Sequence, residues 1–261
     1  MRKNRIIPQL DEIPQLFHPL LTGSAVFDSS CSATAQVLRI ERGQGLYLKS
    51  AAKASLAQEA AMTGYFHSKG LGPEVLEYIS EDQDWLLTAA VPGDDCIASE
   101  HLDQPNRLAE TLGSLLRMLH EQDHSGCPIA DLSTARLSAA ADCYRNRLYD
   151  EGLFPDNWGY ATAEEAWAEI DRNGQYLQCD TLIHGDYCLP NVILDHWHFS
   201  GFIDLGGAGI SDRHFDLFWG MWSLGFNLKT DRYLQRFLDA YGREAINEEI
   251  LRLVAAIEVF S

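Results

Sequence analysis

The sequence predicts an α+β fold of two lobes, in which a small lobe rich in strands precedes a larger lobe that is mainly helical. Short apolar runs bounded by Gly, Pro and acidic residues, which are typical of strands, are concentrated before Pro92-Gly93. Beyond this break, most apolar residues recur at helical spacing. The 261 residues suffice for two lobes with real cores. We therefore expect one lobe over residues 1–91 and another over residues 92–261.

The small lobe is expected to be an antiparallel sheet of five strands with one helix. Four apolar runs mark strands, at 37–40, 46–49, 75–79 and 85–91. Arg42-Gly43-Gln44-Gly45 lies between the first two runs, and such a glycine turn predicts a hairpin. The helix is expected over about 53–67, because Gly70-Leu71-Gly72-Pro73 then supplies the usual stop signals.

In the larger lobe, helices are expected at about 104–121, 133–150, 163–178, 229–241 and 244–258. The first of them is amphipathic, with leucines on one face. Residues 217–226 form the most apolar stretch, which is half the length of a membrane span and predicts a buried helix. Short strands are expected around residues 182–183, 192–194 and 201–203.

The formal net charge of −18 restricts the classes of partner. Nucleic acids and anionic membrane surfaces bind basic patches, so neither is expected as a partner. An acidic cleft would attract a cationic ligand. The same charge would also serve solubility, and charge alone does not decide between these two interpretations.

Six cysteines are scattered along the chain without a CxxC pair or a histidine cluster, which argues against a zinc site. Free, mostly buried thiols in a reducing compartment are expected instead. The basic segment before Pro8 lacks the apolar run of a signal peptide. We therefore expect a cytoplasmic protein.

A polar motif set between short apolar runs carries the strongest functional signal. It consists of His184-Gly185-Asp186, Asn191 five positions after the acid, and Asp204-Leu205-Gly206. In phosphoryl transfer, one carboxylate orients or deprotonates the accepting hydroxyl, while an Asn oxygen and a second Asp hold Mg²⁺. Hairpin turns rich in Asp and Asn are the alternative. The complete set favours catalysis, with Asp186 as the catalytic carboxylate and Asn191 and Asp204 as metal ligands.

Lys49 and Glu59 fit a phosphate-binding role upstream of this motif. In protein kinases, a strand lysine grips the nucleotide phosphates and a glutamate of the next helix holds it. Lys49 ends an apolar strand, and Glu59 lies on the predicted helix that follows. A lone lysine at a strand end is otherwise usually solvated. Ser30 and Ser32, in a loop of small residues, are candidate phosphate contacts, although an ordinary surface turn would look the same.

The expected lobe boundary suggests where the nucleotide base would bind. Backbone groups of Ala89 and Val91 are candidates for pairing with adenine, since backbone contacts need no special side chain. Tyr47, two residues before Lys49, is a candidate for stacking on the base.

These motifs resemble those of the aminoglycoside phosphotransferases, most closely the 3′-phosphotransferase branch. The resemblance extends from about Val26 to the end of the chain and is most specific at 184–191, 199–206 and 212–216. It implies a protein-kinase-like bilobal fold that uses Mg²⁺ and ATP, or GTP in its place. It also implies phosphorylation of a hydroxyl, expected to be the 3′-hydroxyl, of cationic aminoglycoside antibiotics, and therefore resistance to them. We expect a monomer or weak dimer.

The resemblance further implies an acidic pocket for the aminoglycoside. In addition to Asp186, its residues fall on Asp156 with Asn157 in the 151–162 loop, and on Glu258 with Phe260. Acid is expected there because aminoglycosides are polycations.

The chain departs from the family pattern in the substrate half. Gly207 and Trp222 stand where arginines are common, and Ile257 stands where an Asp is usual, while an acid position falls on Phe226 or Asn227. Joint loss of these charges suggests an ion-pair network replaced by apolar packing. Two alternatives remain at this point. One is a kinase of the same fold for another amine, amino sugar or macrolide, and the other is a non-catalytic nucleotide-binding protein, against which the complete motif argues.

Overall fold

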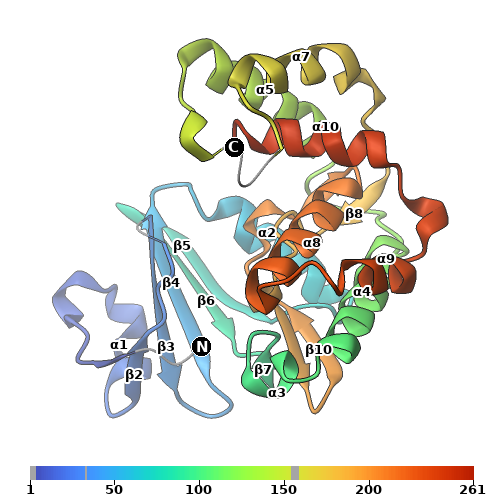
Figure 1. The fold of residues 1–261 in the computed structure, drawn as a ribbon. Coiled ribbons are helices and arrows are strands. Elements are labelled where there is room, and N and C mark those ends of the chain that lie inside the picture. Colours follow the sequence, from blue (N-terminus) through green and yellow to red (C-terminus); the bar gives the residue numbers. More distant parts are fainter. Residues whose placement is uncertain (1–3, 33, 154–158) are drawn as a thin grey trace. The chain divides into compact units, whose positions relative to one another are not determined.

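A computed structural model describes residues 4–32, 34–153 and 159–261 (Figure 1). The chain divides into two compact units. Unit 1 comprises Met1–Cys96 and Pro190–Gly206, and unit 2 comprises Ile97–Leu189 and Gly207–Ser261. The first crossing between the units therefore lies a few residues after Pro92-Gly93, and a later segment returns to unit 1.

The main sheet of unit 1 is antiparallel and has the strand order β1-β2-β3-β4-β6-β5. Its strands are β1 (Asn4–Ile6), β2 (Ala25–Asp28), β3 (Ala35–Glu41), β4 (Leu46–Ala52), β5 (Val75–Ser80) and β6 (Gln83–Ala89). The prediction of five strands was wrong by one, because β1 adds an edge strand through pairing of Arg5 with Phe27. This strand has three residues and no apolar alternation, so its sequence carries no strand signal.

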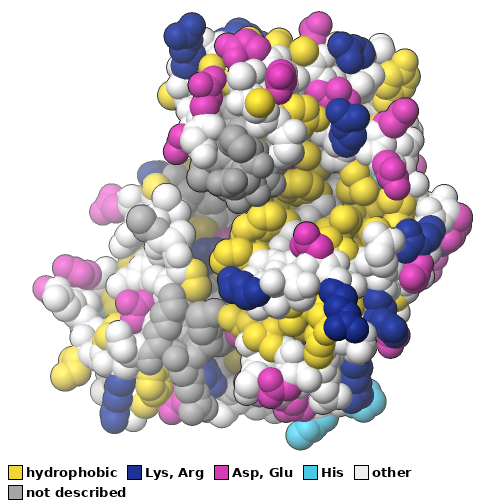
Figure 2. Space-filling view, in the orientation of Figure 1, with side chains coloured by type: hydrophobic (Ala, Val, Ile, Leu, Met, Phe, Trp, Pro, Cys, Tyr) yellow, Lys and Arg dark blue, Asp and Glu magenta, His cyan; other side chains and the backbone are white. Residues whose placement is uncertain are grey.

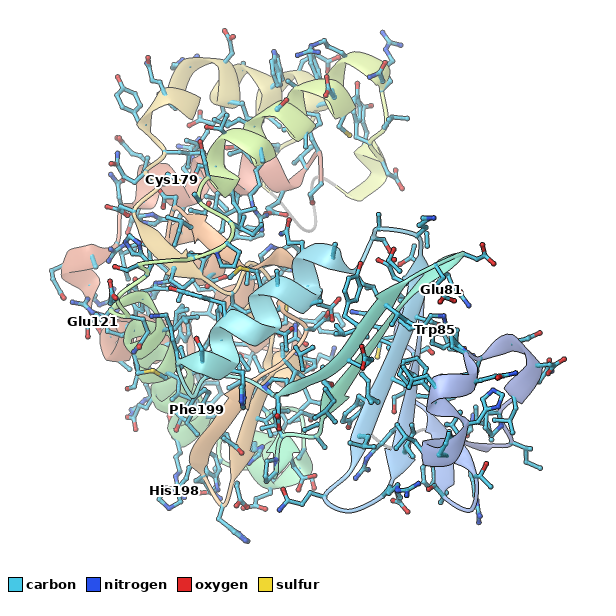
Figure 3. The ribbon with its side chains drawn as sticks, turned by 180° about the vertical axis from the view of Figure 1, so that it is seen from behind. Glu81, Trp85, Glu121, Cys179, His198 and Phe199 are labelled. Atoms are coloured by element: carbon cyan, nitrogen blue, oxygen red, sulfur yellow. The ribbon has the colours of Figure 1, made fainter. Side chains whose placement is uncertain are left out.

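The two faces of this sheet have different partners. On one face, Leu48 and Trp85 form a core with Phe17, from the segment that contains η1 (Leu10–Glu12), η2 (Gln15–Phe17) and α1 (His18–Leu21). The rings of Phe17 and Trp85 are 6.1 Å apart, and Figure 3 labels Trp85 on its strand. Alternation along β4 places Tyr47 and Lys49 on the opposite face, toward α2 (Ala57–Ser68).

A second sheet of unit 1 brings distant segments together in the order β10-β9-β7. Its strands are β7 (Asp94–Asp95), β9 (Val192–Asp195) and β10 (His198–Phe202). Gly93 precedes β7 with φ of +106°, and a Cβ there would overlap the Leu194 carbonyl, so this approach requires glycine. The Phe202 N–H donates to the Leu71 carbonyl at 2.8 Å, which fixes the hairpin next to the end of α2.

Unit 2 is mainly helical. Its helices are α3 (Ser99–Leu102), α4 (Pro105–His120), α5 (Leu132–Asn146), η3 (Glu151–Leu153), α7 (Ala163–Asn173), η4 (Gly174–Tyr176), α8 (His214–Leu228), α9 (Leu234–Tyr241), η7 (Arg243–Ala245) and α10 (Glu248–Glu258). Strands β8 (Thr181–Ile183) and β11 (Gly209–Ser211) pair antiparallel. Two short turns, η5 (Leu189–Asn191) and η6 (Leu205–Gly207), contain the points where the chain passes between the units.

Side-chain caps fix the beginnings of three unit 2 helices. Asp131 accepts from the Thr134 N–H before α5, and Thr162 accepts from the Glu165 N–H before α7. Asn247 caps α10 in the same way. Figure 1 shows α5, α7 and α10 lying together, and their apolar faces form one core cluster. Among the described residues, no helix is both long and apolar enough to cross a membrane.

Candidate active site

Lys49 contacts two carboxylates of unit 1. Its Nζ lies 2.9 and 2.7 Å from the two oxygens of Glu59, and 2.9 Å from Oδ1 of Asp204. Burial lowers the pKa of Lys49, but the attraction of Asp204 and Glu59 outweighs burial and the net shift is upward. The lysine is therefore a fixed cation in a largely desolvated position, suited to an anionic ligand.

Glu59 is the buried member of this cluster, with a side chain that is 11% exposed against 52% for Asp204. Burial raises the pKa of Glu59, and the attraction of Lys49 opposes this shift. Asp204 lies at the more open end of the cluster, where a carboxylate can accept a further cation.

The helix that carries Glu59 is held by the sheet. Asp84 of β6 is fully buried and accepts the backbone N–H groups of Ala54 and Leu56, each at 2.8 Å, just before α2 begins. The Tyr78 hydroxyl donates to the same carboxylate at 3.0 Å. The first turn of α2, and Glu59 in it, is thereby fixed relative to β4.

The turn after Asp204 is bound to the same helix. Asp204 has φ of +60°, an uncommon conformation for a residue other than glycine. Gln58 donates to the Gly206 carbonyl at 2.8 Å. These contacts direct the Asp204 carboxylate toward Lys49, and the role of Asp204 as a metal ligand stays a prediction.

Asn191 lies beside the Asp204 segment at the base of the β9–β10 hairpin. The Ile203 N–H donates to the Asn191 carbonyl at 3.0 Å, so Asp204 follows directly on the residue that pairs with Asn191. One amide and one carboxylate suit Mg²⁺, which usually keeps several waters and takes further ligands from substrate phosphates. Within residues 4–32, 34–153 and 159–261, no three His, Cys, Asp or Glu residues form a metal cluster.

The remaining nucleotide candidates also lie in unit 1. The Ser30 hydroxyl accepts the Val37 N–H at 2.9 Å, and the Ser32 hydroxyl lies 3.2 Å from that of Thr34. The Ala89 N–H donates to the Glu74 carbonyl at 3.0 Å, so an adenine could use only the Ala89 carbonyl. Phosphate and adenine contacts for these residues stay predictions.

In unit 2, the loop after β8 presents Asp186. Gly185 precedes it with φ of +83°, and a Cβ there would overlap the carbonyl oxygen of Gly207. Only glycine fits this combination of backbone conformation and close approach. Tyr187, which follows Asp186, is buried and donates its hydroxyl to the Leu112 carbonyl at 2.9 Å.

A buried acid supports this loop from α8. Asp216 accepts the N–H of His184 at 2.6 Å and that of Gly185 at 2.7 Å. Burial would raise the pKa of Asp216, but the hydrogen bonds from His120 and from the backbone N–H groups lower it overall. Asp216 therefore stays ionised and holds the two residues that precede Asp186.

His120 of α4 completes the support. Its Nε2 lies 3.2 Å from Asp216, and its Nδ1 lies 2.8 Å from the Tyr241 hydroxyl. Burial lowers the pKa of His120 and raises that of Tyr241 to about 12. These directions favour a neutral imidazole that donates from Nε2 to Asp216 and accepts from Tyr241 at Nδ1.

Glu258 lies at the end of α10 and is 3% exposed. Nη1 of Arg136 donates to it at 3.1 Å, and Nη2 of the same arginine donates to the Gly185 carbonyl at 3.1 Å. Asp186 is near enough to raise the pKa of Glu258 further, although burial is the larger cause of that upward shift. Asp186 and Glu258, both predicted as site residues, therefore belong to one electrostatic cluster within unit 2.

Phe260 is 3% exposed and packs against Tyr144, Tyr149 and Trp167 at centroid distances of 5.6, 5.5 and 6.3 Å. This placement makes Phe260 an anchor of the segment after Glu258, and its contact with substrate stays a prediction. Asp156 and Asn157 lie outside the described residues.

Three of the positions that depart from the family pattern carry apolar side chains that are stacked or buried. Trp222 and Phe226 of α8 stack with ring centroids 5.0 Å apart and planes inclined by 11°, and Ile257 is 3% exposed. Figure 2 shows hydrophobic side chains gathered over the part of unit 2 where Figure 1 labels α8. The suggested replacement of an ion-pair network by apolar packing stays a prediction.

Sequence reasoning did not identify Arg136 as a functional residue, and it did not include Asp216 among the candidate site residues. Both act on backbone groups of the Asp186 loop, 49 and 31 or more positions away along the chain. No local pattern marks such contacts. The only signal was the position of Asp216 in the motif at 212–216.

Comparisons with known proteins agree with this geometry. Residues 29–254 match the model of the phosphotransferase enzyme family. Over 254 residues, the chain is 45% identical to a probable aminoglycoside 3′-phosphotransferase of Lactococcus lactis subsp. lactis, covering 96% of both chains. The chain belongs to the aminoglycoside phosphotransferase family.

Solved structures of other aminoglycoside phosphotransferases share its protein-kinase-like fold. A crystal structure of a type VIII aminoglycoside 3′-phosphotransferase superposes with a TM-score of 0.78 at 27% identity, covering 97% of this chain and 99% of that one. An aminoglycoside phosphotransferase of Streptomyces rimosus ATCC10970, in complex with ADP and streptomycin, has a TM-score of 0.71 at 24% identity. It covers 86% of this chain and 90% of that one, and this likeness concerns the fold alone.

Proposed function

We propose that this protein is an ATP- and Mg²⁺-dependent kinase that phosphorylates the 3′-hydroxyl of aminoglycoside antibiotics and thereby confers resistance to them. The observation that carries the proposal is the contact of Lys49 with both Glu59 and Asp204. This is the arrangement a phosphoryl-transfer enzyme needs to bind a nucleoside triphosphate. The similarity to aminoglycoside 3′-phosphotransferases supports the acceptor and its position.

Unit 1 supplies the nucleotide-binding residues. Lys49, fixed by Glu59, binds the phosphates, and Tyr47 stacks on the base beside backbone groups of Ala89 and Val91. Ser30 and Ser32 contribute further phosphate contacts. Asn191 and Asp204 would hold the Mg²⁺, which supplies electrostatic stabilisation of the phosphates.

Unit 2 supplies the acceptor site. Asp186 orients the substrate hydroxyl and accepts its proton, and Asp216 keeps the Asp186 loop in place for this task. Glu258 and Asp186, with Asp156, Asn157 and Phe260, bind the polycationic substrate. Most of the rate acceleration then comes from positioning and electrostatics, because the protein forms no covalent intermediate.

The cell compartment and partners follow from the same chemistry. All six cysteines lie among the described residues and none of them forms a disulfide, which supports a cytoplasmic location. ATP is the proposed phosphate donor, and GTP is the alternative donor to be compared with it in the same assay. The partners are a nucleoside triphosphate and a cationic aminoglycoside, without nucleic acid or membrane, and the protein acts as a monomer or weak dimer.

Replacement of Asp186 tests the proposal. Asp186→Ala is expected to abolish phosphorylation of kanamycin, while calorimetry still detects binding of ATP with Mg²⁺. The product of the wild-type enzyme is expected to carry phosphate on the 3′-oxygen, as shown by phosphorus–proton NMR correlation. Turnover that survives in the variant, or phosphate at another position, would contradict the assignment.

A second candidate is a kinase of the same fold for another amine, amino sugar or macrolide. The stacked Trp222 and Phe226, at positions where the family pattern has charge, favour it. A resistance panel in a sensitive bacterium, combined with phosphate incorporation across these classes, separates the two. Turnover confined to a compound other than an aminoglycoside would support this second candidate.

A further inference from the structure

The carboxylate that would bind the substrate already has a cation beside it. Glu258 and Arg136 form an ion pair at 3.1 Å, with side-chain exposures of 2% and 20%. A buried carboxylate that lacks a cationic partner is strongly disfavoured and tends to take up a proton. Arg136 is therefore the main group that opposes protonation of the buried Glu258.

The other arm of the same guanidinium reaches the catalytic loop. Nη2 donates to the carbonyl of Gly185, the residue before Asp186, at 3.1 Å. The guanidinium also lies over the ring of Phe215, 4.5 Å from its centroid. A planar, rigid fork held on an aromatic face fixes both acceptors at once, which the flexible ammonium of lysine does not do.

We infer that Arg136 is a positioning residue for the acceptor site, where it keeps Glu258 charged and fixes the loop that presents Asp186. This inference rests on the proposed function, and it assigns Arg136 a role that the catalytic motifs do not include. Binding of the substrate amine and placement of its hydroxyl then depend on one side chain of α5.

The groups around Glu258 predict that the effect of losing Arg136 depends on pH. Arg136 of α5 faces it, as do Asp186 of the loop after β8, Trp219 of α8 and Ser261. Burial raises the pKa of Glu258, Arg136 is the largest opposing influence, and Asp186 raises the pKa further. Loss of Arg136 would therefore leave Glu258 neutral up to a higher pH than in the wild type.

Steady-state kinetics of four variants test the two halves of this role. Arg136→Met is expected to raise the KM for kanamycin roughly tenfold or more at pH 7 and to leave the KM for ATP within about twofold of wild type. The ratio of variant to wild-type KM is expected to fall toward one by about pH 9, as Glu258 ionises. Glu258→Gln is expected to show no such recovery, and the KM for kanamycin of the double variant is expected to be no higher than that of Glu258→Gln alone.

Arg136→Lys separates charge from position. It is expected to keep the wild-type pH profile of KM, because a cation remains, and to lower kcat, because the second contact to Gly185 is lost. Arg145→Met is the matched control, since Arg145 lies on the same helix and its ion pair with Asp142 is exposed. No change in either kinetic constant is expected for that control.

Three results would overturn the inference: an equal rise in the KM for ATP, a KM ratio that does not vary with pH, or additive effects of the two substitutions on the KM for kanamycin. Should the wild type phosphorylate no aminoglycoside, the proposed function fails, and amide hydrogen exchange of the peptide 182–189 decides the inference instead. Faster exchange in Arg136→Met or Arg136→Lys than in Arg145→Met supports the coupling. Unchanged exchange contradicts it.

Discussion

At the scale of single residues, the side chains proposed to contact the ligand are more exposed than those that hold them in place. Lys49 and Asp204 lie at the partly open end of a cluster, while Glu59 is buried behind them. In the same way, Asp216 and His120 are buried beneath the loop that ends in Asp186. The supporting residues therefore contribute to stability, and their replacement affects both folding and function.

Replacing Lys49 with Met leaves Glu59 and Asp204 close together without their shared cation. We expect kcat/KM for ATP to fall at least about a hundredfold, because a fixed charge on the phosphates is lost. The exposed Lys53→Met is the control, and it should leave kcat/KM unchanged. Calorimetric titration with ATP measures binding directly, and wild-type affinity in Lys49→Met would contradict the assignment.

His120 predicts a pH dependence of stability. Because burial lowers its pKa, the unfolded chain takes up a proton more readily than the folded chain. The stability that comes from the neutral ring is present above the ordinary pKa of 6.5 and is lost as the pH falls toward the lower folded-state value. Asp216 acts in the same direction, in the window below its ordinary pKa of 3.8.

The Tm of the wild type is therefore expected to fall between about pH 7 and pH 5, and the slope should be smaller in His120→Gln. The Tm of His120→Gln will be lower at every pH, so the quantity to compare is the change of Tm with pH. His124→Gln, in which an exposed histidine is replaced, is expected to keep the wild-type slope. Equal slopes in all three proteins would show that His120 is not the titrating group.

At the scale of elements, the site depends on backbone segments that approach each other closely. The loop after β8 passes so near the Gly207 carbonyl that no side chain fits at Gly185. The β9–β10 hairpin joins the Asn191 segment to the Asp204 segment by a backbone hydrogen bond at its base. These contacts explain why functional groups on short loops are held in defined positions.

Gly185→Ala tests the first of these approaches. We expect the free energy of unfolding to fall by more than about 3 kcal/mol. The backbone at Gly207 must move away from the new Cβ, and the alanine must also adopt a left-handed conformation. Gly126→Ala is a matched control, since Gly126 has φ of +75° with open space around its Cβ position. That change should cost only about 1–2 kcal/mol, the strain of a left-handed residue. Urea denaturation measures both, and equal losses would exclude the clash.

Prediction from sequence succeeded where an element carries a local pattern. The apolar runs of β3, β4 and β6 and the leucine face of α4 were visible in this way. The edge strand β1 carries no such pattern. Helix α5 ends at Asn146 because Arg147 adopts a left-handed conformation, and the sequence has no glycine there to predict this helix end. The pairing of Lys49 with Glu59 followed from element order, whereas the reach of Arg136 to Gly185 depends on tertiary packing and could not be predicted.

At the scale of the whole molecule, the net charge of −18 bears on the encounter with substrate. A polycation is attracted by this field, while ATP, an anion, is repelled, and salt screens both effects. We expect kcat/KM for kanamycin to fall several-fold between about 50 and 500 mM KCl. kcat/KM for ATP, measured as the control at saturating kanamycin, should stay level or rise. A fall of similar size for both substrates would show that salt acts on the fold instead.

The return of residues 190–206 to unit 1 has a consequence for how such genes can recombine. A single crossover near codon 96 would give a chimera whose β7 comes from one parent and whose β9, its partner in the sheet, comes from the other. A full exchange of unit 1 requires a second exchanged segment, bounded near Leu189 and Gly206. Shuffled libraries of related resistance genes should therefore be enriched for survivors that inherit both segments from the same parent.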